Sequence, residues 1–142
     1  MKIKIKTASG FVPEYETAGS AGMDIKAFLQ EPVIIEPGKR ALIPTGVFLE
    51  IPEGYEVQIR ARSGLSVKYG IGLTNGIGTI DSDYRGEIKI SLINWGEAPF
   101  TVNNGDRIAQ MIAAKYERVD FELADSLNET ERGDGGFGHT GI

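Results

Sequence analysis

The sequence of 142 residues contains no cysteine and a single histidine, His139. The absence of cysteine excludes disulfides, thiolate zinc sites and cysteine nucleophiles together. One histidine is too few for a histidine-rich metal site, so any bound metal must be held by oxygen ligands. Such ligands favour Mg²⁺ or Ca²⁺ over zinc or copper.

Long apolar runs and an excess of positive charge are also missing. Apolar stretches such as 71–73 and 108–114 are interrupted by polar or charged residues before they could cross a bilayer, so no membrane partner is expected. The formal net charge of −5 argues against nucleic acid as a partner, because binding to its backbone needs a basic face. The segment MKIKIKTASG alternates lysine and isoleucine at strand period instead of leading into a signal-peptide core. We therefore expect a cytoplasmic protein.

Short β-rich segments separated by proline and glycine fill most of the chain. The predicted strands lie at 2–6, 24–28, 33–35, 40–44, 47–51, 56–60, 78–81, 87–94 and 107–116. Many short strands at this spacing predict an all-β sandwich or barrel, of which the jelly roll is one form. One short helix is expected at 63–69, with Ser63 as its cap. The length predicts a single domain, 1–142.

The last segment, ERGDGGFGHTGI at 131–142, differs from the rest because five of its residues are glycine. This is too many for a core strand, so we expect a flexible C-terminal arm. Residues 133–138 fit the G-x-G-x-x-G pattern, but a dinucleotide fold needs a strand before the pattern and a helix after it. The arm is interpreted instead as an anion-binding flap, in which Arg132 binds phosphate and Phe137 covers a base.

The segment TNGIGTIDSDYRGEI, at 74–88, carries two carboxylates and an aromatic ring. Asp81 and Asp83 are two residues apart, so on an extended chain both side chains point the same way. A carboxylate near a water molecule can act as a general base or hold the hydration shell of Mg²⁺. The same pair can also cap backbone amides in a turn, and Tyr84 can be an ordinary core or rim aromatic. Both interpretations stay open for this segment alone.

Three further segments carry weaker signals. In RSGLSVKYG, at 62–70, the exposed amides of a helix start and the Arg62 guanidinium can bind phosphate, or Arg62 can simply pair with an acid. In GDRIAQMI, at 105–112, Arg107 and Gln110 can reach a ligand or face water. AGMDIKA, at 21–27, is interpreted as a turn that leads into a strand.

Together and in this order, these segments resemble the five ordered motifs of the deoxyuridine triphosphatase (dUTPase) family. The resemblance covers nearly the whole chain, and DSDYRG and RGDGGFG are its most specific parts. It implies a jelly-roll-like fold of the β-clip type and hydrolysis of dUTP to dUMP and pyrophosphate by Mg²⁺-assisted attack of water on the α-phosphorus. It also implies a homotrimer with active sites shared between the subunits.

The resemblance further implies roles for individual residues. Asp81 would be the base that activates the attacking water, and Asp24 would lie near the hydrated Mg²⁺. Asn75 and the neighbouring hairpin backbone would face uracil, and Tyr84 would lie under the deoxyribose. The full set of residues implied in substrate binding is Arg62, Ser63, Gly64, Asn75, Gly78, Tyr84, Gln110, Arg132, Phe137, Gly138 and Thr140. The family usually has a small hydroxyl residue where this chain has His139, whose neutral ring can still donate a hydrogen bond.

Two other functions are weighed against dUTP hydrolysis. The related dCTP deaminase family shares the fold and the trimer, but its catalytic glutamate falls ten residues after the position of Asp81, where this chain has Ser91. A sensor that binds dUTP without turnover is the second alternative. Asp81 argues against it, because a pure binder gains nothing from a free carboxylate beside a polyanion.

Overall fold

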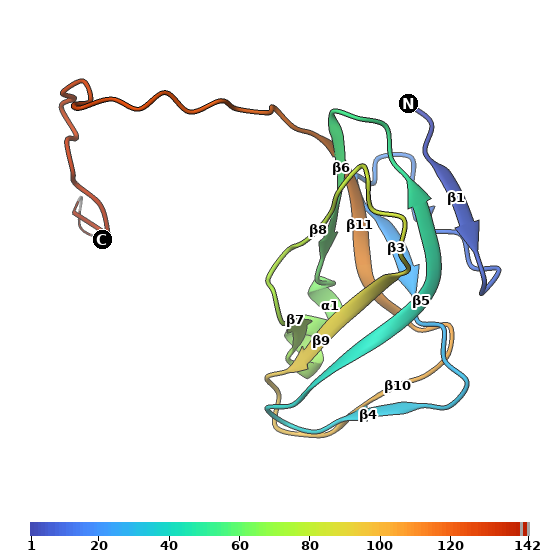
Figure 1. Cartoon of the computed structure of the whole chain (residues 1–142). Coiled ribbons are helices and arrows are strands. Elements are labelled where there is room, and N and C mark those ends of the chain that lie inside the picture. Colours follow the sequence, from blue (N-terminus) through green and yellow to red (C-terminus); the bar gives the residue numbers. More distant parts are fainter. Residues whose placement is uncertain (140, 142) are drawn as a thin grey trace.

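Almost every regular element of the protein is a strand. The computed structural model describes residues 1–139 and 141. Its strands are β1 (Lys4–Thr7), β2 (Glu14–Tyr15), β3 (Met23–Lys26), β4 (Val33–Ile35), β5 (Arg40–Glu50), β6 (Tyr55–Arg60), β7 (Ile71–Leu73), β8 (Gly78–Ile80), β9 (Ile88–Asn94), β10 (Phe100–Val102) and β11 (Arg107–Lys115). Among the described residues, α1 (Ser63–Tyr69) is the only helix (Figure 1). The all-β, jelly-roll-like fold expected from the sequence is confirmed.

Two main antiparallel sheets form the body. The first has the order β1-β5-β9-β7, and the second has the order β2-β3-β11-β6-β8. A small ribbon of β10 and β4 lies at the lower end of the body (Figure 1). Most neighbours within these sheets are far apart in the sequence, so the strands exchange between the sheets as the chain proceeds.

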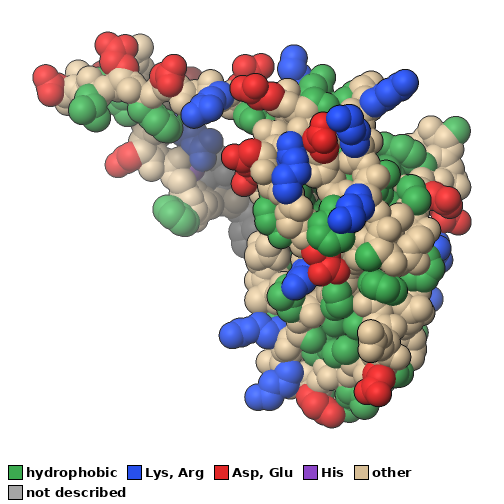
Figure 2. Space-filling model, turned by 45° about the vertical axis from the view of Figure 1, so that its right-hand side comes forward, with side chains coloured by type: hydrophobic (Ala, Val, Ile, Leu, Met, Phe, Trp, Pro, Cys, Tyr) green, Lys and Arg blue, Asp and Glu red, His purple; other side chains and the backbone are tan. Residues whose placement is uncertain are grey.

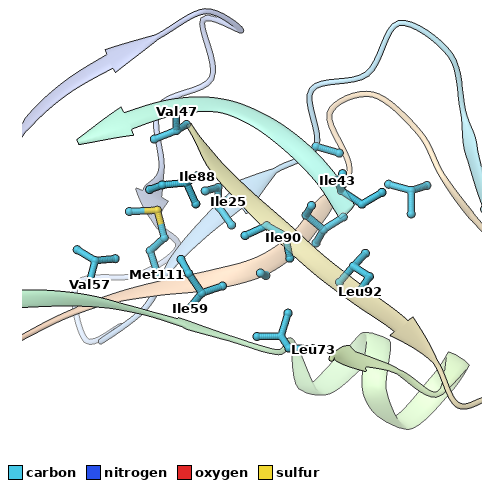
Figure 3. Packing of buried hydrophobic residues seen from close by; sticks show 14 of the residues in the cluster. Ile25, Ile43, Val47, Val57, Ile59, Leu73, Ile88, Ile90, Leu92 and Met111 are labelled. Carbon is cyan, nitrogen blue, oxygen red and sulfur yellow. The ribbon is translucent and has the colours of Figure 1, made fainter. Parts of the chain in front are cut away.

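The core lies between the two main sheets and is largely aliphatic. Along β9 the buried side chains alternate with more exposed ones, so Ile88, Ile90 and Leu92 point inward. Figure 3 shows them facing side chains from the second sheet, including Ile59 and Met111. Burial of each such side chain stabilises the fold by roughly 1.5–3 kcal/mol relative to exposure.

Strand β5 corrects the prediction of two separate strands at 40–44 and 47–51. It runs without a break as Arg40–Glu50, and its pairing with β9 shifts between Pro44 and Val47. Gly46 sits in this irregularity with a φ of 68°, a value that glycine adopts readily. The bulge accommodates Pro44, which cannot donate to a strand ladder, so the proline does not end the strand.

Three short strands were not predicted, namely β2, β7 and β10. β2 and β10 are too short to show a period, whereas β4 and β8, of three residues each, were recognised as β-rich segments. In β7 all three residues are buried, so polar residues do not alternate with apolar ones along it.

Helix α1 has the predicted bounds, but the predicted cap is wrong. The N-cap is Arg62, in extended conformation and without a side-chain capping bond, and Ser63 is the first helical residue. The Arg62 side chain is engaged elsewhere, as described below. The helix ends at Gly70, whose φ of 69° turns the chain and whose N–H bonds to Leu65 O and Ser66 O.

The chain's single tryptophan packs on the edge where β7 meets β9. The backbone N–H of Trp95 donates to Gly70 O at 2.8 Å. The Trp95 indole covers Gly72 so closely that a Cβ on Gly72 would lie 3.1 Å from Trp95 Cε3. The outer side of the indole is open, since Trp95 is 64% exposed.

After β11 the chain leaves the body. Residues 117–134 are exposed and contain no strand or helix, and the described part of the chain after β11 extends away from the body (Figure 1). None of the described helices has the length and apolar character required to span a membrane.

Candidate functional site

A group of charged side chains gathers around Asp24 on β3. Arg62 Nε donates to Asp24 Oδ1 at 3.0 Å, and Arg107 Nη1 donates to Asp24 Oδ2 at 3.1 Å. Arg62 Nη1 also donates to Arg107 O at 3.1 Å, and Arg107 has a second, exposed partner in Glu16 at 3.2 Å. The Asp24 side chain is only 15% exposed. Of the two sequence interpretations for Arg62, pairing with an acid is therefore what the structure contains.

Gln110 lies beside this group because β11 pairs with both neighbours at that point. It is opposite Asp24 on β3 and opposite Arg60 on β6. Its side chain covers Gly22, where a Cβ would lie 2.8 Å from Gln110 Oε1. Two residues after Arg60 the chain reaches the start of α1, where Ser63 and Gly64 are exposed. The structure thus brings Asp24, Arg62, Ser63, Gly64 and Gln110 to one region.

The Asp24 region contains oxygen ligands that could hold a metal ion together with water. Among the described residues there is no cluster of three or more His, Asp or Glu side chains that could form a protein cage. Asp24 uses each oxygen for one arginine, but a carboxylate has about four acceptor positions. It can therefore still accept from water. This donor set fits Mg²⁺, which usually keeps several waters and binds substrate phosphates.

The segment 74–78 joins the two main sheets, so the predicted hairpin is not a paired hairpin. β7 pairs with β9, whereas β8 pairs with β6. Asn75 is exposed in the connecting turn, and Gly78 is buried opposite Ile59. A Cβ on Gly78 would lie 3.1 Å from Ile59 Cβ and 3.5 Å from Asn75 Nδ2. The missing side chain at Gly78 thus lets Ile59 and Asn75 approach its backbone closely.

Asp81 and Tyr84 line the same pocket, which is about 360 Å³ in volume. Its lining consists of Leu42, Thr79, Ile80, Asp81, Tyr84, Glu87, Ile88 and Lys89. Asp81 follows the end of β8, three residues and about 10 Å along the strand from Gly78. The Tyr84 hydroxyl donates to Glu87 O at 3.0 Å, which holds the ring at the side of the pocket.

The extended chain assumed for Asp81 and Asp83 in the sequence argument is not present. Residues 82 and 83 form a turn, and Tyr84 N–H donates to Asp81 O at 3.2 Å across it. The period-two argument applies only to extended chain. Asp81 and Asp83 nevertheless both line one cleft of about 550 Å³, together with Arg85 and Arg118.

Glu87 is a residue of this pocket that the sequence analysis did not single out. Its carbonyl accepts the Tyr84 hydroxyl, and its Oε1 accepts Gly46 N–H at 2.9 Å from the bulge of β5. Only the sheet arrangement brings positions 46 and 87 together, so no local pattern could have identified the contact.

The arm residues lie apart from both groups. Arg132 Nε donates to Gly135 O at 2.8 Å within the arm itself. Phe137 is fully exposed and has a φ of 49°, and Gly138 follows with a φ of 84°. Thr140 lies outside the described residues. Within one chain, the arm is thus separate from the Asp81 pocket and the Asp24 group (Figure 1).

Comparisons with known proteins agree on one family. A family model described as dUTPase matches residues 8–141. The deoxyuridine 5′-triphosphate nucleotidohydrolase of Finegoldia magna is 55% identical over 142 residues, which is 99% of either chain. The enzyme of the same name from Chlamydia trachomatis serovar D is 54% identical over 143 residues, again 99% of either chain.

Solved structures are similar over the same extent. The dUTPase of Staphylococcus bacteriophage 80alpha with dUpNHpp has a TM-score of 0.90 and 26% identity, with 99% of either chain covered. A dUTPase variant from phage phi11 of S. aureus, described with a structural Mg(II) ion, has a TM-score of 0.80 at 23% identity. The match covers 89% of this chain and 98% of that one, and at this identity it shows the fold alone.

Proposed function

Since this chain belongs to the dUTPase family, we propose that it hydrolyses dUTP to dUMP and pyrophosphate by attack of water on the α-phosphorus. The observation that carries the proposal is the pocket lined by both Asp81 and Tyr84. A carboxylate beside an aromatic wall can hold a water molecule against a nucleotide whose sugar lies on the ring.

Asp81 acts as the general base in this proposal. It takes a proton from the water while the water oxygen forms a bond to the α-phosphorus and the bond to the pyrophosphate oxygen breaks. Asp81 is exposed at the end of β8, where solvent can supply the nucleophile. Most of the rate then comes from positioning and neutralisation of charge.

Base selectivity comes from the turn between β7 and β8. Asn75 and the backbone near Gly78 contact uracil, and the missing side chain at Gly78 lets Ile59 and Asn75 pack against this backbone. Groups arranged for uracil are left unpaired by cytosine, and a close fit excludes the methyl group of thymine. Tyr84 lies against the deoxyribose and leaves no room for a ribose 2′-hydroxyl.

The region around Asp24 holds the triphosphate. Ser63, Gly64 and Gln110 contact phosphate oxygens, and Arg62 supports them from its bond to Asp24. Asp24 would hold Mg²⁺ through water. When bound, the ion neutralises phosphate charge and increases the electrophilicity of the α-phosphorus.

Residues 131–142 close over the bound nucleotide as an arm of the single domain 1–142. Arg132, Gly138 and Thr140 contact the γ-phosphate, and Phe137 covers the base. Five glycines make the segment entropically costly to order, so closure depends on the ligand. Since the described part of the arm lies away from its own body, the pocket that the arm closes belongs to another copy in this proposal (Figure 1).

The active assembly is a homotrimer in this proposal. The segment 119–123, between β11 and the arm, supports association with another copy. Val119, Phe121 and Leu123 alternate with Asp120 and Glu122, so an extended chain has an apolar side and an acidic side. Phe121 and Leu123 are 93% and 100% exposed. An isolated subunit gains nothing from that exposure, whereas burial against a neighbour stabilises by roughly 1.5–3 kcal/mol for each side chain.

Strand β1 offers a complementary surface to such a segment. It alternates Lys4 and Lys6 with Ile5, and its only partner among the described strands is β5, so one edge is open. An apolar groove of about 170 Å³ beside it is lined by Ile3, Ile5, Val12, Pro13, Met23, Leu49 and Met111. Figure 2 shows acidic groups along the arm and basic groups on the upper body. The segment 119–123 of a second copy fits this groove and edge.

The assembly is tested by light scattering on the parent protein and on two variants of the chain between β11 and the arm. Phe121→Asp should lower the average mass at micromolar protein, whereas Leu127→Asp, which changes an 89% exposed residue outside the alternating segment, should not. A monomeric parent protein would contradict the assembly.

The hydrolysis itself is tested with separate nucleotides. The protein is incubated with Mg²⁺ and dUTP, dTTP, dCTP or UTP, and monophosphate and pyrophosphate are measured. We expect turnover of dUTP to exceed turnover of the other three nucleotides clearly. The Asp81→Asn variant is the control, and it should still bind nucleotide. Binding without any turnover would identify a sensor instead. Release of ammonia from dCTP would identify a deaminase, which is disfavoured because Ser91 stands where that family has its catalytic glutamate.

A further inference from the structure

Tyr84 lies directly over the backbone of Gly86. A Cβ built on Gly86 would lie 2.5 Å from Tyr84 Cζ and 2.8 Å from Tyr84 Cε2, and closest to the Tyr84 hydroxyl oxygen. These separations are far shorter than a carbon–carbon contact, which is about 3.5–4.0 Å. The ring can therefore occupy its observed position only because residue 86 has no side chain.

The backbone at Gly86 does not itself require glycine. Gly86 is absent from the residues with positive φ, so alanine is compatible with its conformation. What alanine would displace is the ring, since the clash is with Tyr84 alone among the nearest atoms. Gly86 thus differs from Gly46 and Gly70, where a positive φ favours glycine for conformational reasons.

The surface that Tyr84 rests on is firmly attached to the body. Gly46 N–H donates to Glu87 Oε1 at 2.9 Å, and the Thr45 hydroxyl donates to Ile88 O at 2.6 Å. Glu87 O in turn accepts the Tyr84 hydroxyl at 3.0 Å. Because β5 holds the residues that follow Gly86, an added side chain has to move the ring and not the strand.

We propose that Gly86 is a positioning residue that fixes the Tyr84 ring as the sugar wall of the pocket and thereby sets the discrimination between deoxyribonucleotides and ribonucleotides. This inference rests on the proposed function. The ring and Asp81 line the same pocket, so a displaced ring enlarges the space for a 2′-hydroxyl without altering the base that activates water.

The test measures kcat/KM for dUTP and UTP in four variants beside the parent protein. Gly86→Ala should lower the preference for dUTP over UTP about tenfold, the lower end of what a small steric change in a pocket contributes. Tyr84→Ala should lower it at least as much. Gly86→Ala added to Tyr84→Ala should change the preference no further, because the ring is already gone. Gly19→Ala is the matched control, since a Cβ there meets no atom within 4 Å.

Each outcome decides the matter. A merely structural role for Gly86 would lower activity on both nucleotides equally and leave the preference unchanged, which would overturn the inference while leaving dUTP hydrolysis intact. A parent protein without dUTP turnover would remove the proposed function and the inference together. If Gly86→Ala does not fold but the double variant does, the clash with the ring is supported. If neither folds, glycine is needed by the backbone and the inference is wrong.

Discussion

The hydrogen bonds of Asp24 predict that two substitutions will differ strongly in their effect on the free energy of unfolding. Each substitution replaces one of the two carboxylates that accept from Arg107. Asp24 is 15% exposed and accepts from two guanidinium groups, whereas Glu16 is 74% exposed and accepts from Arg107 alone. Asp24→Asn keeps one acceptor oxygen, removes the negative charge and turns an amide donor towards an arginine. Glu16→Gln changes only a solvated pair.

The expected magnitudes follow from burial. Hydrogen bonds to charged groups contribute about 1.5–3 kcal/mol each, and breaking a well-buried ion pair costs roughly 3–5 kcal/mol. For Asp24, which is mostly but not fully buried, we expect a loss of roughly 2–3 kcal/mol of unfolding free energy. For Glu16 the expected loss is about 0–0.5 kcal/mol, as for other exposed pairs.

Urea denaturation of both variants, followed by far-UV circular dichroism, measures these losses. Protein concentration must be the same throughout, because association couples stability to concentration. With a slope of about 2 kcal/mol per molar urea, Asp24→Asn should lower the midpoint by roughly 1 M or more. Equal shifts for the two variants would refute the reasoning, since they would show that burial of Asp24 does not strengthen its pairing.

Three further outcomes are expected. Asp81→Asn should lower kcat for dUTP by roughly 10²–10⁴-fold with little change in nucleotide binding, and near-normal kcat would show that Asp81 is not the base. Deletion of 131–142 should leave the melting temperature and oligomer mass unchanged but lower kcat/KM; unchanged kinetics would place the arm outside the active site. The pKa of Glu50 lies below its usual value because Lys4 Nζ donates to it and attracts its charge, so Lys4→Met should raise that pKa in an NMR titration. The contact contributes stability above the usual pKa of Glu50 and loses it as the pH falls through the lowered value, so a pKa unaffected by Lys4→Met would contradict the pairing.

Local sequence patterns predicted the elements whose residues have a clear period. The strand predicted at 87–94 as a β-rich segment and the helix predicted at 63–69 agree closely with β9 and α1. Pro44 misled the prediction for β5, because a bulge that only the neighbouring strand reveals lets the chain continue. Strand β7 escaped notice because it is buried on both sides and carries a glycine.

The candidate site divides in a similar way. Segments such as 62–70 and 74–88 could be identified from their own residues and from the family resemblance. The bonds that organise them could not, because Arg62 and Arg107 are 38 and 83 residues from Asp24 in the sequence. Likewise, the turn at 82–83 was not predicted, so the extended-chain argument for Asp81 and Asp83 does not apply.

The position of the single tryptophan makes the protein its own optical probe. Trp95 sits on Gly72 at the outer edge of the four-stranded sheet, with one face in solvent, whereas Asp24 and Gln110 belong to the other main sheet. Trp95 fluorescence therefore reports the unfolding of one sheet. Substitutions around Asp24 lie in the other sheet, away from the indole. Coincident fluorescence and circular dichroism transitions would mean that the two sheets unfold as one cooperative unit, whereas an earlier fluorescence change would mean that the β7–β9 edge frays first.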